Sequence, residues 1–234
     1  MSEAGSAMTM ASEVDVYLVD TAAEKARLSR YESLLSPGEK ERAAGFRFDR
    51  DRSRFVCMHG ILRLVLSGYL GTHADKIDFL EGEYGKPGAA GGFEFNIGYS
   101  GETGLIAVTR VPVGVDIEMV DPEKVTPEMI EEVFSSSERK SYFGDASLDV
   151  TDAFFRGWVR KESVIKATGA GVSFPLDLVE SRLDRESYTA VCDGVEWWTC
   201  GLGGCGPGYE AALTVAGEGR PPTIKLRPLT DRPW

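Results

Sequence analysis

The chain has 234 residues, 42% of them hydrophobic, and a formal net charge of −11 at pH 7. This length suits one large domain or two fused units of about a hundred residues each. The negative charge argues against nonspecific nucleic-acid binding, which needs a basic surface. No apolar run approaches the roughly 18 residues that a membrane span requires, and residues 1–12 lack the pattern of a secretory signal. We therefore expect a cytoplasmic protein that binds neither nucleic acid nor membrane.

The first half of the chain predicts a strand followed by two helices. After a disordered tail over residues 1–12, Val14–Leu18 reads as a strand, Ser36 and Glu39 form a capping box at the start of a helix, and Phe55–Leu66 is an apolar helix. Between positions 40 and 63, seven basic residues stand against three acidic ones. This basic island favours contact with a small anionic ligand or a local anionic partner. A solvated helix face with internal ion pairs would give the same pattern.

The second half repeats this order of elements. The strand-like segment Val113–Ile117 lies 99 positions after Val14–Leu18, and a second capping box, Ser135 with Glu138, lies 99 positions after the first. The same offset aligns the first apolar helix with a helix over 154–166. We therefore predict an α/β (α+β) fold with a pseudo-twofold duplication, in which residues 13–111 form an N-terminal lobe, residues 112–216 form a C-terminal lobe, and residues 217–234 form a proline-rich, extended or disordered tail.

Three acidic residues of the second half are candidates for a metal site. The period of two along a strand places Asp116 and Glu118 on one face of the segment 113–118. On the helix over 154–166, Trp158, Glu162 and Lys166 recur four positions apart and share one stripe. Neighbouring carboxylates repel one another unless a cation lies between them, and three of them form an all-oxygen set suited to magnesium. Spacing alone leaves open a structural salt-bridge network instead.

The order and spacing of these motifs resemble a known family. The run Gly114-Val115-Asp116-Ile117-Glu118 is followed some forty positions later by Trp158-x-x-Lys161-Glu162-x-x-x-Lys166. The pair resembles the signature of the 4'-phosphopantetheinyl transferases, in their long, two-lobed, single-chain form. The resemblance extends over further segments of the chain, namely Glu41-Arg42, Arg54, Arg63, Glu83-Tyr84-Gly85-Lys86-Pro87, Phe95-Asn96-Ile97 and Ser100-Gly101.

This resemblance implies an activity and its partners. Members of the family transfer the 4'-phosphopantetheine arm of coenzyme A to a serine of an acyl or peptidyl carrier protein, depend on Mg²⁺, and release adenosine 3',5'-bisphosphate. The implied enzyme is cytoplasmic and, in its long form, typically a monomer. The resemblance leaves open whether its carrier proteins serve fatty-acid, polyketide or nonribosomal peptide assembly.

The resemblance also implies roles for single residues. Asp116, Glu118 and Glu162 would hold Mg²⁺ on the pyrophosphate, and Lys166 would steady the charge of that group. The residues expected at the adenosine and phosphate end of coenzyme A are Arg42, Arg54 and Lys86, with Lys40 as a neighbouring candidate and Tyr99 and Ser100 beside them. Tyr99 stands where the family usually has a phosphate-contacting histidine, and a neutral hydroxyl donates one hydrogen bond but cannot supply a positive charge.

The chemistry predicts a base and leaves two rival functions. We expect Glu162 to accept the proton of the attacking serine, either directly or through a water bound to the metal. Three carboxylates and a lysine would serve water as well as serine, so a magnesium-dependent nucleotide phosphoesterase is one alternative. Tyr99 suggests the other alternative, a catalytically silent relative that binds a carrier protein or a nucleotide.

Overall fold

Each half of the chain begins with a strand, continues with helices and ends with further strands. The computed structural model describes residues 13–81, 86–89, 91–144, 148–171, 173–217 and 221–229, so the tail predicted over residues 1–12 lies outside the described part. The first half contains β1 (Glu13–Asp20), α1 (Leu28–Leu34), α2 (Pro37–Ala44), α3 (Asp49–Leu70), β2 (Phe79–Glu81), β3 (Pro87–Ala89), β4 (Glu94–Ser100) and β5 (Thr103–Thr109). The second half contains β6 (Val113–Met119), α4 (Pro127–Val133), α5 (Ser136–Glu138), α6 (Val150–Thr168), β7 (Ser187–Cys192), β8 (Val195–Gly201), β9 (Tyr209–Ala216) and β10 (Thr223–Pro228).

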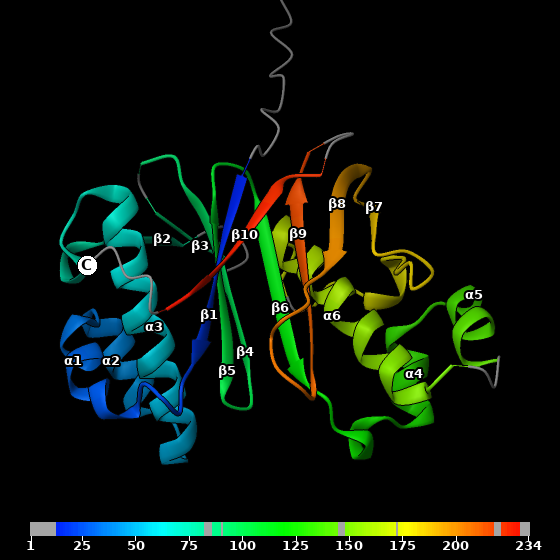
Figure 1. Cartoon of the computed structure of the whole chain (residues 1–234), viewed down its shortest axis with the longest axis horizontal. Coiled ribbons are helices and arrows are strands. Elements are labelled where there is room, and N and C mark those ends of the chain that lie inside the picture. The colour runs from blue at the N-terminus through cyan, green and yellow to red at the C-terminus, as the bar shows by residue number, and fades with distance from the viewer. Residues whose placement is uncertain are drawn as a thin grey trace, which may run out of the picture.

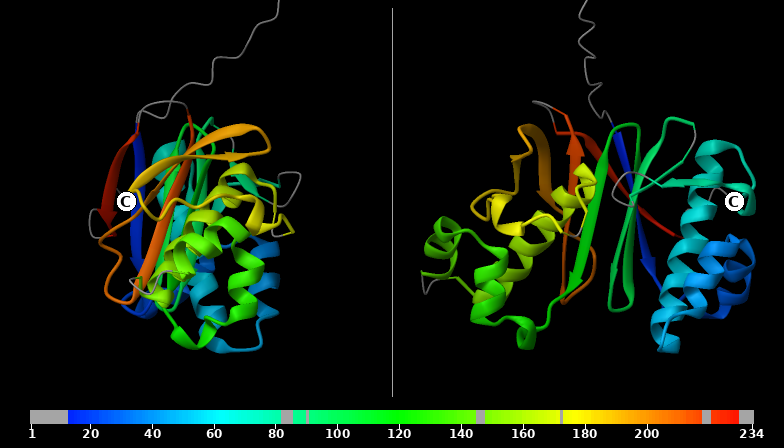
Figure 2. Two further views of the ribbon diagram at one scale, coloured as in Figure 1. Left: turned by 90° about the vertical axis from the view of Figure 1, so that its right-hand side faces the viewer. Right: turned by 180° about the vertical axis from the view of Figure 1, so that it is seen from behind.

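Two four-stranded sheets lie at the centre of the molecule, with helices on their outer sides (Figure 1; Figure 2). Their strand orders are β10-β1-β5-β4 and β6-β9-β8-β7, while β2 and β3 form a separate two-stranded ribbon. This arrangement of sheets and helices agrees with the predicted α/β fold class. None of the helices in the described part of the chain has the length and apolarity needed to cross a membrane.

The last strand returns to the first sheet, which corrects the prediction of a tail over residues 217–234. Strand β10 pairs in parallel with β1, so that Val14 lies opposite Ile224 and Val16 opposite Leu226. The Nε of Arg227 also donates to a carboxylate oxygen of Asp15 at 2.5 Å. The segment 223–228 is extended, as expected, but it belongs to the sheet of the N-terminal lobe. Residues 218–220 and 230–234 lie outside the described part.

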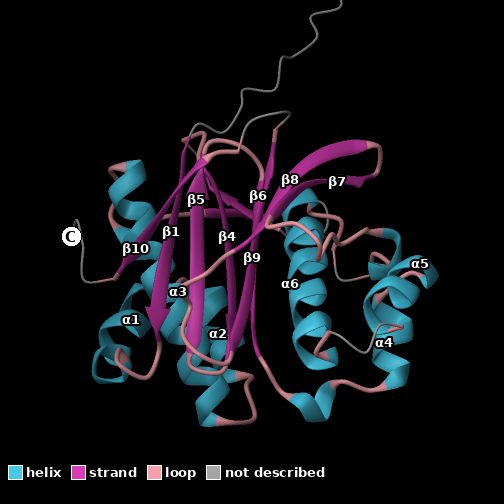
Figure 3. Ribbon diagram, turned by 45° about the vertical axis from the view of Figure 1, so that its right-hand side comes forward, coloured by secondary structure: helices cyan, strands magenta, loops and turns pink. Residues whose placement is uncertain are grey.

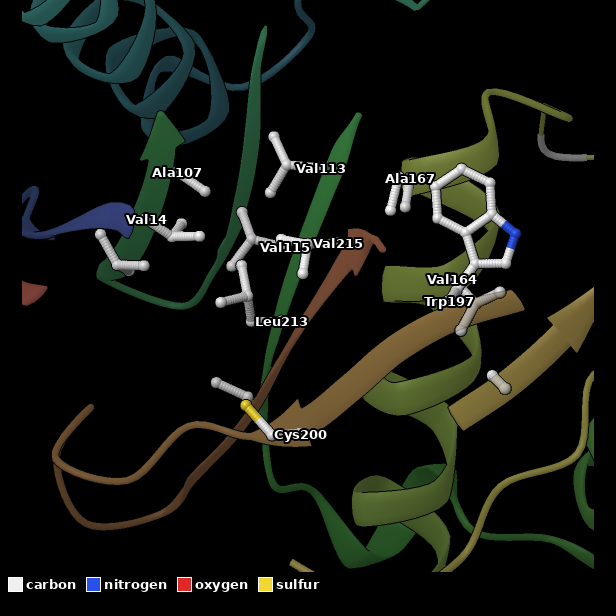
Figure 4. Close-up of a cluster of buried hydrophobic side chains, with 14 of the residues drawn as sticks. Val14, Ala107, Val113, Val115, Val164, Ala167, Trp197, Cys200, Leu213 and Val215 are labelled. Carbon is white, nitrogen blue, oxygen red and sulfur yellow. The ribbon is translucent and has the colours of Figure 1, made fainter. Parts of the chain in front are cut away.

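Alternate side chains of the first sheet enter two different cores. Tyr17 of β1 packs in a core with α3, whereas Val14 of the same strand joins a second core on the opposite face of the sheet. That second core also contains Val115 of β6 and Leu213 of β9, which come from the second sheet (Figure 4). The two sheets therefore pack face to face, and α3 and α6 cover the outer faces.

The two halves share one order of connections. In the first half, β1 is followed by α3 and then by β4 and β5, and β5 pairs with β1. In the second half, β6 is followed by α6 and then by β8 and β9, and β9 pairs with β6 (Figure 3). Both predicted capping boxes form, one at the start of α2 and one at the start of α5. The repeated order of elements is thus accompanied by a repeated strand pairing.

A fully buried ion pair fixes α6 against the loop that follows it. Lys161 is 0% exposed, and its Nζ lies 2.7 Å from Oε2 of Glu138. The same ammonium donates to the carbonyl oxygens of Leu176 at 3.2 Å and Val179 at 2.5 Å. The second carboxylate oxygen of Glu138 accepts from both the amide and the hydroxyl of Ser181 at 2.7 Å. Three acceptors thus satisfy the three donors of the ammonium.

Replacing Lys161 with alanine is expected to lower the free energy of unfolding by about 3–5 kcal/mol, because it leaves the buried carboxylate of Glu138 without its cation. Urea denaturation at neutral pH measures this change. The matched control is the double variant Lys161→Met with Glu138→Gln, which removes both charges and should recover part of the loss. Equal destabilisation by the single and double variants would contradict a role for charge pairing.

Candidate active site

Strand β6 lies directly against helix α6. A Cβ at position 114 would lie 2.0 Å from the carbonyl oxygen of Ser163 on α6, so this close approach requires Gly114. Because side chains alternate along a strand, Asp116 and Glu118 share the face of Gly114. The structure thus agrees with the one-face arrangement that the strand period predicts, and that face is turned toward α6.

An ion pair joins the two elements. The Nζ of Lys166 on α6 donates to Oδ1 of Asp116 at 2.5 Å, and Asp116 is only 4% exposed. Burial alone would lower the pKa of the Lys166 ammonium, but Asp116, Glu162 and Glu118 together raise it above its usual value. The other oxygen of Asp116, Oδ2, is buried and has no hydrogen-bond partner among the described residues. A buried oxygen left in this state is costly, which makes it a natural ligand for an added cation.

The second carboxylate of β6 is tied to the neighbouring strand β4. The hydroxyl of Ser100 donates to Oε2 of Glu118 at 2.7 Å and accepts from the amide of Met119 at 3.1 Å. Burial raises the pKa of Glu118, the hydrogen bond from Ser100 lowers it, and the charge of Asp116 raises it again, with a net increase. Ser100, expected beside coenzyme A, is therefore in direct contact with an expected metal ligand.

Glu162 on α6 completes the acidic trio. Burial raises the pKa of its carboxyl group, Asp116 raises it further, Lys166 lowers it and Glu118 raises it, so that the net shift is upward. Across the described residues, no three His, Cys, Asp or Glu side chains are arranged closely enough to hold a metal ion. The donor chemistry nevertheless fits a hard dication, because the trio offers only carboxylate oxygens and Oδ2 of Asp116 is buried without a hydrogen-bond partner among the described residues. The magnesium site remains a prediction.

Two cations of the N-terminal lobe, Arg42 and Arg54, affect Tyr99 at the end of β4. Burial raises the pKa of the Tyr99 hydroxyl, while the charges of Arg42, Lys166 and Arg54 each lower it in part, so cations of both lobes act on this residue. Arg54 is 18% exposed and contacts Glu102 at 3.3 Å, and its Nε is buried without a partner among the described residues. The exposed guanidinium of Arg42 lies 5.4 Å from the ring centroid of Phe55.

Two other residues expected to contact coenzyme A, Lys40 and Lys86, lie in different surroundings. Lys40 on α2 is exposed to solvent. The ammonium of Lys86 instead donates to the carbonyl oxygens of Val113 at 3.0 Å and Ala167 at 2.9 Å, and burial lowers its pKa to about 8. Lys86 thus links β6 to the end of α6. Its predicted contact with coenzyme A stays a prediction, and residues 83–85 of the motif before it lie outside the described part.

Sequence reasoning gave no role to Asn96, which joins the lobes. Its side-chain oxygen accepts from the amide of Val115 at 2.9 Å, so it connects β4 to β6 beside Asp116. The signal was a single amide residue inside the apolar run Phe95-Asn96-Ile97, because a polar group in a buried strand needs a partner.

A pocket of about 350 Å³ opens beside Glu118 and is lined by Lys124, Met129, Phe154, Phe155 and Trp158. An apolar group can therefore lie next to the carboxylates.

Helix α2, which carries Lys40 and Arg42, is held by the carboxylate of Glu39. The amide of Ser36 donates to Oε2 of Glu39 at 2.8 Å, as the capping box predicts. Arg63 of α3 donates to the same oxygen at 2.7 Å, and His59 contacts Oε1 at 3.0 Å. Burial would raise the pKa of Glu39, but His59, Ser36 and Arg63 lower it from 4.5 to about 2.

The contacts of Glu39 predict a loss of stability in acid. The folded state lowers the pKa of this carboxyl group, so its contribution of about 3 kcal/mol is complete above pH 4.5 and is lost as the pH falls from 4.5 toward 2. Urea unfolding between pH 7 and pH 2.5 measures the change, and Glu39→Gln should remove this part of the pH dependence. An unchanged pH profile in the Gln variant would contradict the assignment.

Comparisons with known proteins agree with this geometry. A sequence model of the 4'-phosphopantetheinyl transferase superfamily matches residues 112–201, which include β6 and α6. The chain is 31% identical over 164 residues to the 4'-phosphopantetheinyl transferase Sfp of Bacillus subtilis, an alignment that covers 69% of this chain and 72% of Sfp. It is 30% identical over 170 residues to HetI of a Nostoc species, covering 70% and 72% of the two chains.

Two further comparisons differ in how strongly they support an assignment to a family. The Bacillus subtilis 4'-phosphopantetheinyl transferase ffp is 29% identical over 201 residues, with 84% of this chain and 89% of that protein covered. A crystal structure of Thermotoga maritima holo-[acyl-carrier-protein] synthase superposes with a TM-score of 0.33 at 18% identity, over 47% of this chain and 65% of that chain, which is too low to carry an argument. The identity to Sfp over most of both sequences decides the assignment: the chain belongs to the 4'-phosphopantetheinyl transferase family.

Proposed function

We propose that this enzyme transfers the 4'-phosphopantetheine arm of coenzyme A to a serine of an acyl or peptidyl carrier protein, with Mg²⁺, and releases adenosine 3',5'-bisphosphate. The observation that carries the proposal is the meeting of Asp116 and Lys166, with Glu118 and Glu162 close enough to raise the pKa of the same ammonium. Membership of the family supports 4'-phosphopantetheine as the group that is transferred. A monomer working in the cytoplasm is part of the proposal.

Three carboxylates would hold the metal, namely Asp116, Glu118 and Glu162. When bound there, Mg²⁺ would supply positive charge to the pyrophosphate of coenzyme A, where negative charge accumulates as the bond to the leaving group breaks. Lys166 supports the same task, because its raised pKa keeps the ammonium charged at neutral pH. Charges fixed before the reaction stabilise the transition state without further reorganisation.

Glu162 would take the proton of the attacking serine. A general base works best when its pKa lies near the working pH, and burial together with Asp116 and Glu118 raises the pKa of Glu162 in that direction. Glu118 is a weaker candidate, since the hydroxyl of Ser100 already donates to its carboxylate at 2.7 Å. The nearby ammonium of Lys166 opposes the rise and limits it.

The cations of the N-terminal lobe would bind the adenosine and phosphate end. Arg42 and Arg54 lower the pKa of Tyr99 together with Lys166, so the charges of both lobes act on one hydroxyl. Because the pKa of Tyr99 is raised, this hydroxyl stays protonated and would donate a hydrogen bond to a phosphate oxygen. Binding of coenzyme A should therefore lack the pH dependence that a histidine at this position would give.

Mass spectrometry of a carrier protein tests the proposal. The carrier protein is incubated with the enzyme, coenzyme A and Mg²⁺, and a mass gain of one phosphopantetheine arm is expected. A carrier protein with its acceptor serine changed to alanine is the control. No gain under any of these conditions would overturn the proposal. Steady hydrolysis of coenzyme A without carrier protein would favour the phosphoesterase alternative instead.

A further inference from the structure

We infer that Glu39 and Glu138 are matched positioning residues, each of which orients the helix that carries one half of the proposed site. The inference rests on the proposed function, because it assigns coenzyme A binding to the N-terminal half and the carboxylate chemistry to the C-terminal half. We call the contacts of Glu39 with Arg63 the N-terminal clamp and the contacts of Glu138 with Lys161 the C-terminal clamp.

The N-terminal clamp joins three segments of the first lobe. Glu39 belongs to the capping box of α2, and its Oε2 accepts from Nε of Arg63 on α3 at 2.7 Å. Nη1 of Arg63 donates to the carbonyl oxygens of Ala74 at 3.0 Å and Ile77 at 2.9 Å, at the turn that follows α3. Arg63 is 1% exposed. One buried cation thus holds the start of α2, the middle of α3 and the turn after it.

The C-terminal clamp has the same parts in the same order. Glu138 belongs to the capping box of α5 and accepts from Lys161 on α6, which is 0% exposed. Lys161 donates to the carbonyl oxygens of Leu176 and Val179, again at a turn after the helix. In both clamps the two carbonyls are three residues apart and belong to a single-turn 3-10 helix and the residue after it, with Ala74–Lys76 in one and Leu176–Leu178 in the other.

The repeated contacts favour a specific role. A buried cation is tolerated only when nearby acceptors satisfy it, so each clamp fixes one relative position of its segments. The two lobes keep this arrangement although one cation is an arginine and the other a lysine, and although their other site residues differ. The two cations lie 98 positions apart, one fewer than the 99 that separate Glu39 from Glu138, so Arg63 aligns with Glu162 and the cation of the second clamp is the residue before it, Lys161. The clamps are therefore alike in their contacts, and not in a strict position-by-position match of the two helices.

Each clamp lies beside the residues whose positions it would set. In the first lobe, His59 contacts Glu39 at 3.0 Å and stacks on Phe55 with ring centroids 3.9 Å apart. The guanidinium of Arg42 lies over the same ring, 5.4 Å from its centroid. A continuous set of contacts therefore leads from Glu39 to an expected coenzyme A ligand.

In the second lobe the connection is more direct. Lys161 precedes Glu162 in the sequence and lies on the same helix as Lys166. A rotation of α6 that released Lys161 from Glu138 would also turn both residues away from Asp116. The N-terminal clamp should therefore govern the binding of coenzyme A, and the C-terminal clamp should govern the chemical step.

Steady-state kinetics with Glu39→Gln and Glu138→Gln tests this division. Glutamine still forms a capping box, so each change removes charge from the clamp and keeps most of the local shape. With saturating carrier protein and Mg²⁺, Glu39→Gln should raise KM for coenzyme A about tenfold and leave kcat within about twofold. Glu138→Gln should lower kcat about tenfold with little change in KM. If both variants changed the two constants alike, the inference would be wrong.

Two further variants separate the clamp from general stability. Arg63→Lys gives the N-terminal clamp the cation found in the C-terminal clamp, and should keep KM for coenzyme A within about threefold of the original value. Ser36→Ala breaks the capping hydrogen bond to the amide of Glu39 but leaves the ion pair, and should change KM less than Glu39→Gln does. A larger effect of Ser36→Ala would assign the role to capping and overturn the clamp.

Hydrogen exchange provides a readout that does not depend on activity. Relative to the overall loss of stability measured by urea unfolding, amides of α2 should exchange faster than those of α6 in Glu39→Gln, and amides of α6 faster than those of α2 in Glu138→Gln. If exchange changes locally in this way but the unmodified enzyme transfers no phosphopantetheine, the clamps are supported and the proposed function is refuted. Transfer by the unmodified enzyme with uniform exchange in both variants would refute the clamps alone.

Discussion

Replacing Asp116 with alanine is expected to lower the rate of phosphopantetheine transfer by about a thousandfold, because it removes one of the preorganised charges on which the transition state depends. The change deletes the partner of Lys166 and the buried Oδ2, which has no hydrogen-bond partner among the described residues. The remaining activity should no longer respond to Mg²⁺. Initial rates over a range of Mg²⁺ concentrations measure both effects.

A carboxylate on the same sheet provides the control. Glu210 of β9 lies directly opposite Glu118 in the antiparallel pairing, so both side chains point to the same face. Burial raises the pKa of Glu210, and Arg156 lowers it in part, which places it in a different charge environment. Glu210→Gln should keep its dependence on Mg²⁺. Retained magnesium activation in Asp116→Ala, or its loss in Glu210→Gln, would show that the predicted ligands are wrong.

Local patterns in the sequence predicted much of the arrangement around Asp116. The strand period placed Asp116 and Glu118 on one face, and both residues lie on the face of β6 that packs against α6. The serine and glutamate spacing predicted the capping boxes, which depend only on residues three positions apart. These features could be predicted because their physical cause lies within one turn or one strand.

Contacts between distant segments could not be predicted in this way. Strand β10 pairs with β1 across more than two hundred positions, and no local pattern in a proline-rich segment specifies that partner. The ammonium of Lys86 donates to the carbonyl oxygens of Val113 and Ala167, contacts that no local pattern around position 86 specifies. The burial of Lys161 depends likewise on acceptors from two other segments.

The charge balance of the site explains why a metal is expected although the carboxylates already have a positively charged neighbour, the ammonium of Lys166. Lys166 brings one positive charge to a group that contains Asp116, Glu118 and Glu162. The pKa values of Glu118 and Glu162 remain raised, which means that the ammonium does not fully offset burial and mutual repulsion. Protonation of these groups competes with metal binding, so the affinity for Mg²⁺ should fall as the pH is lowered.

Replacing Glu162 with glutamine is expected to lower kcat by about a hundredfold or more, because the serine proton loses its acceptor. The raised pKa of Glu162 gives the sign of the pH effect. The carboxylate must be deprotonated to act as a base. The rate of the unmodified enzyme should therefore increase with pH around an apparent pKa that lies above the pKa of an ordinary glutamate. The Gln variant should lack this part of the pH–rate profile.

Saturating Mg²⁺ separates the two roles expected of Glu162. While Asp116 remains in place, the loss of a second carboxylate that only holds the metal can be compensated by a higher metal concentration, whereas a lost base cannot. Glu118→Gln is the matched comparison, because Glu118 is an expected ligand whose carboxylate already accepts from Ser100. Excess Mg²⁺ should restore most of the rate of Glu118→Gln and little of that of Glu162→Gln. Full recovery of Glu162→Gln would remove Glu162 as the base and leave its metal-binding role, since the proton would then have another acceptor.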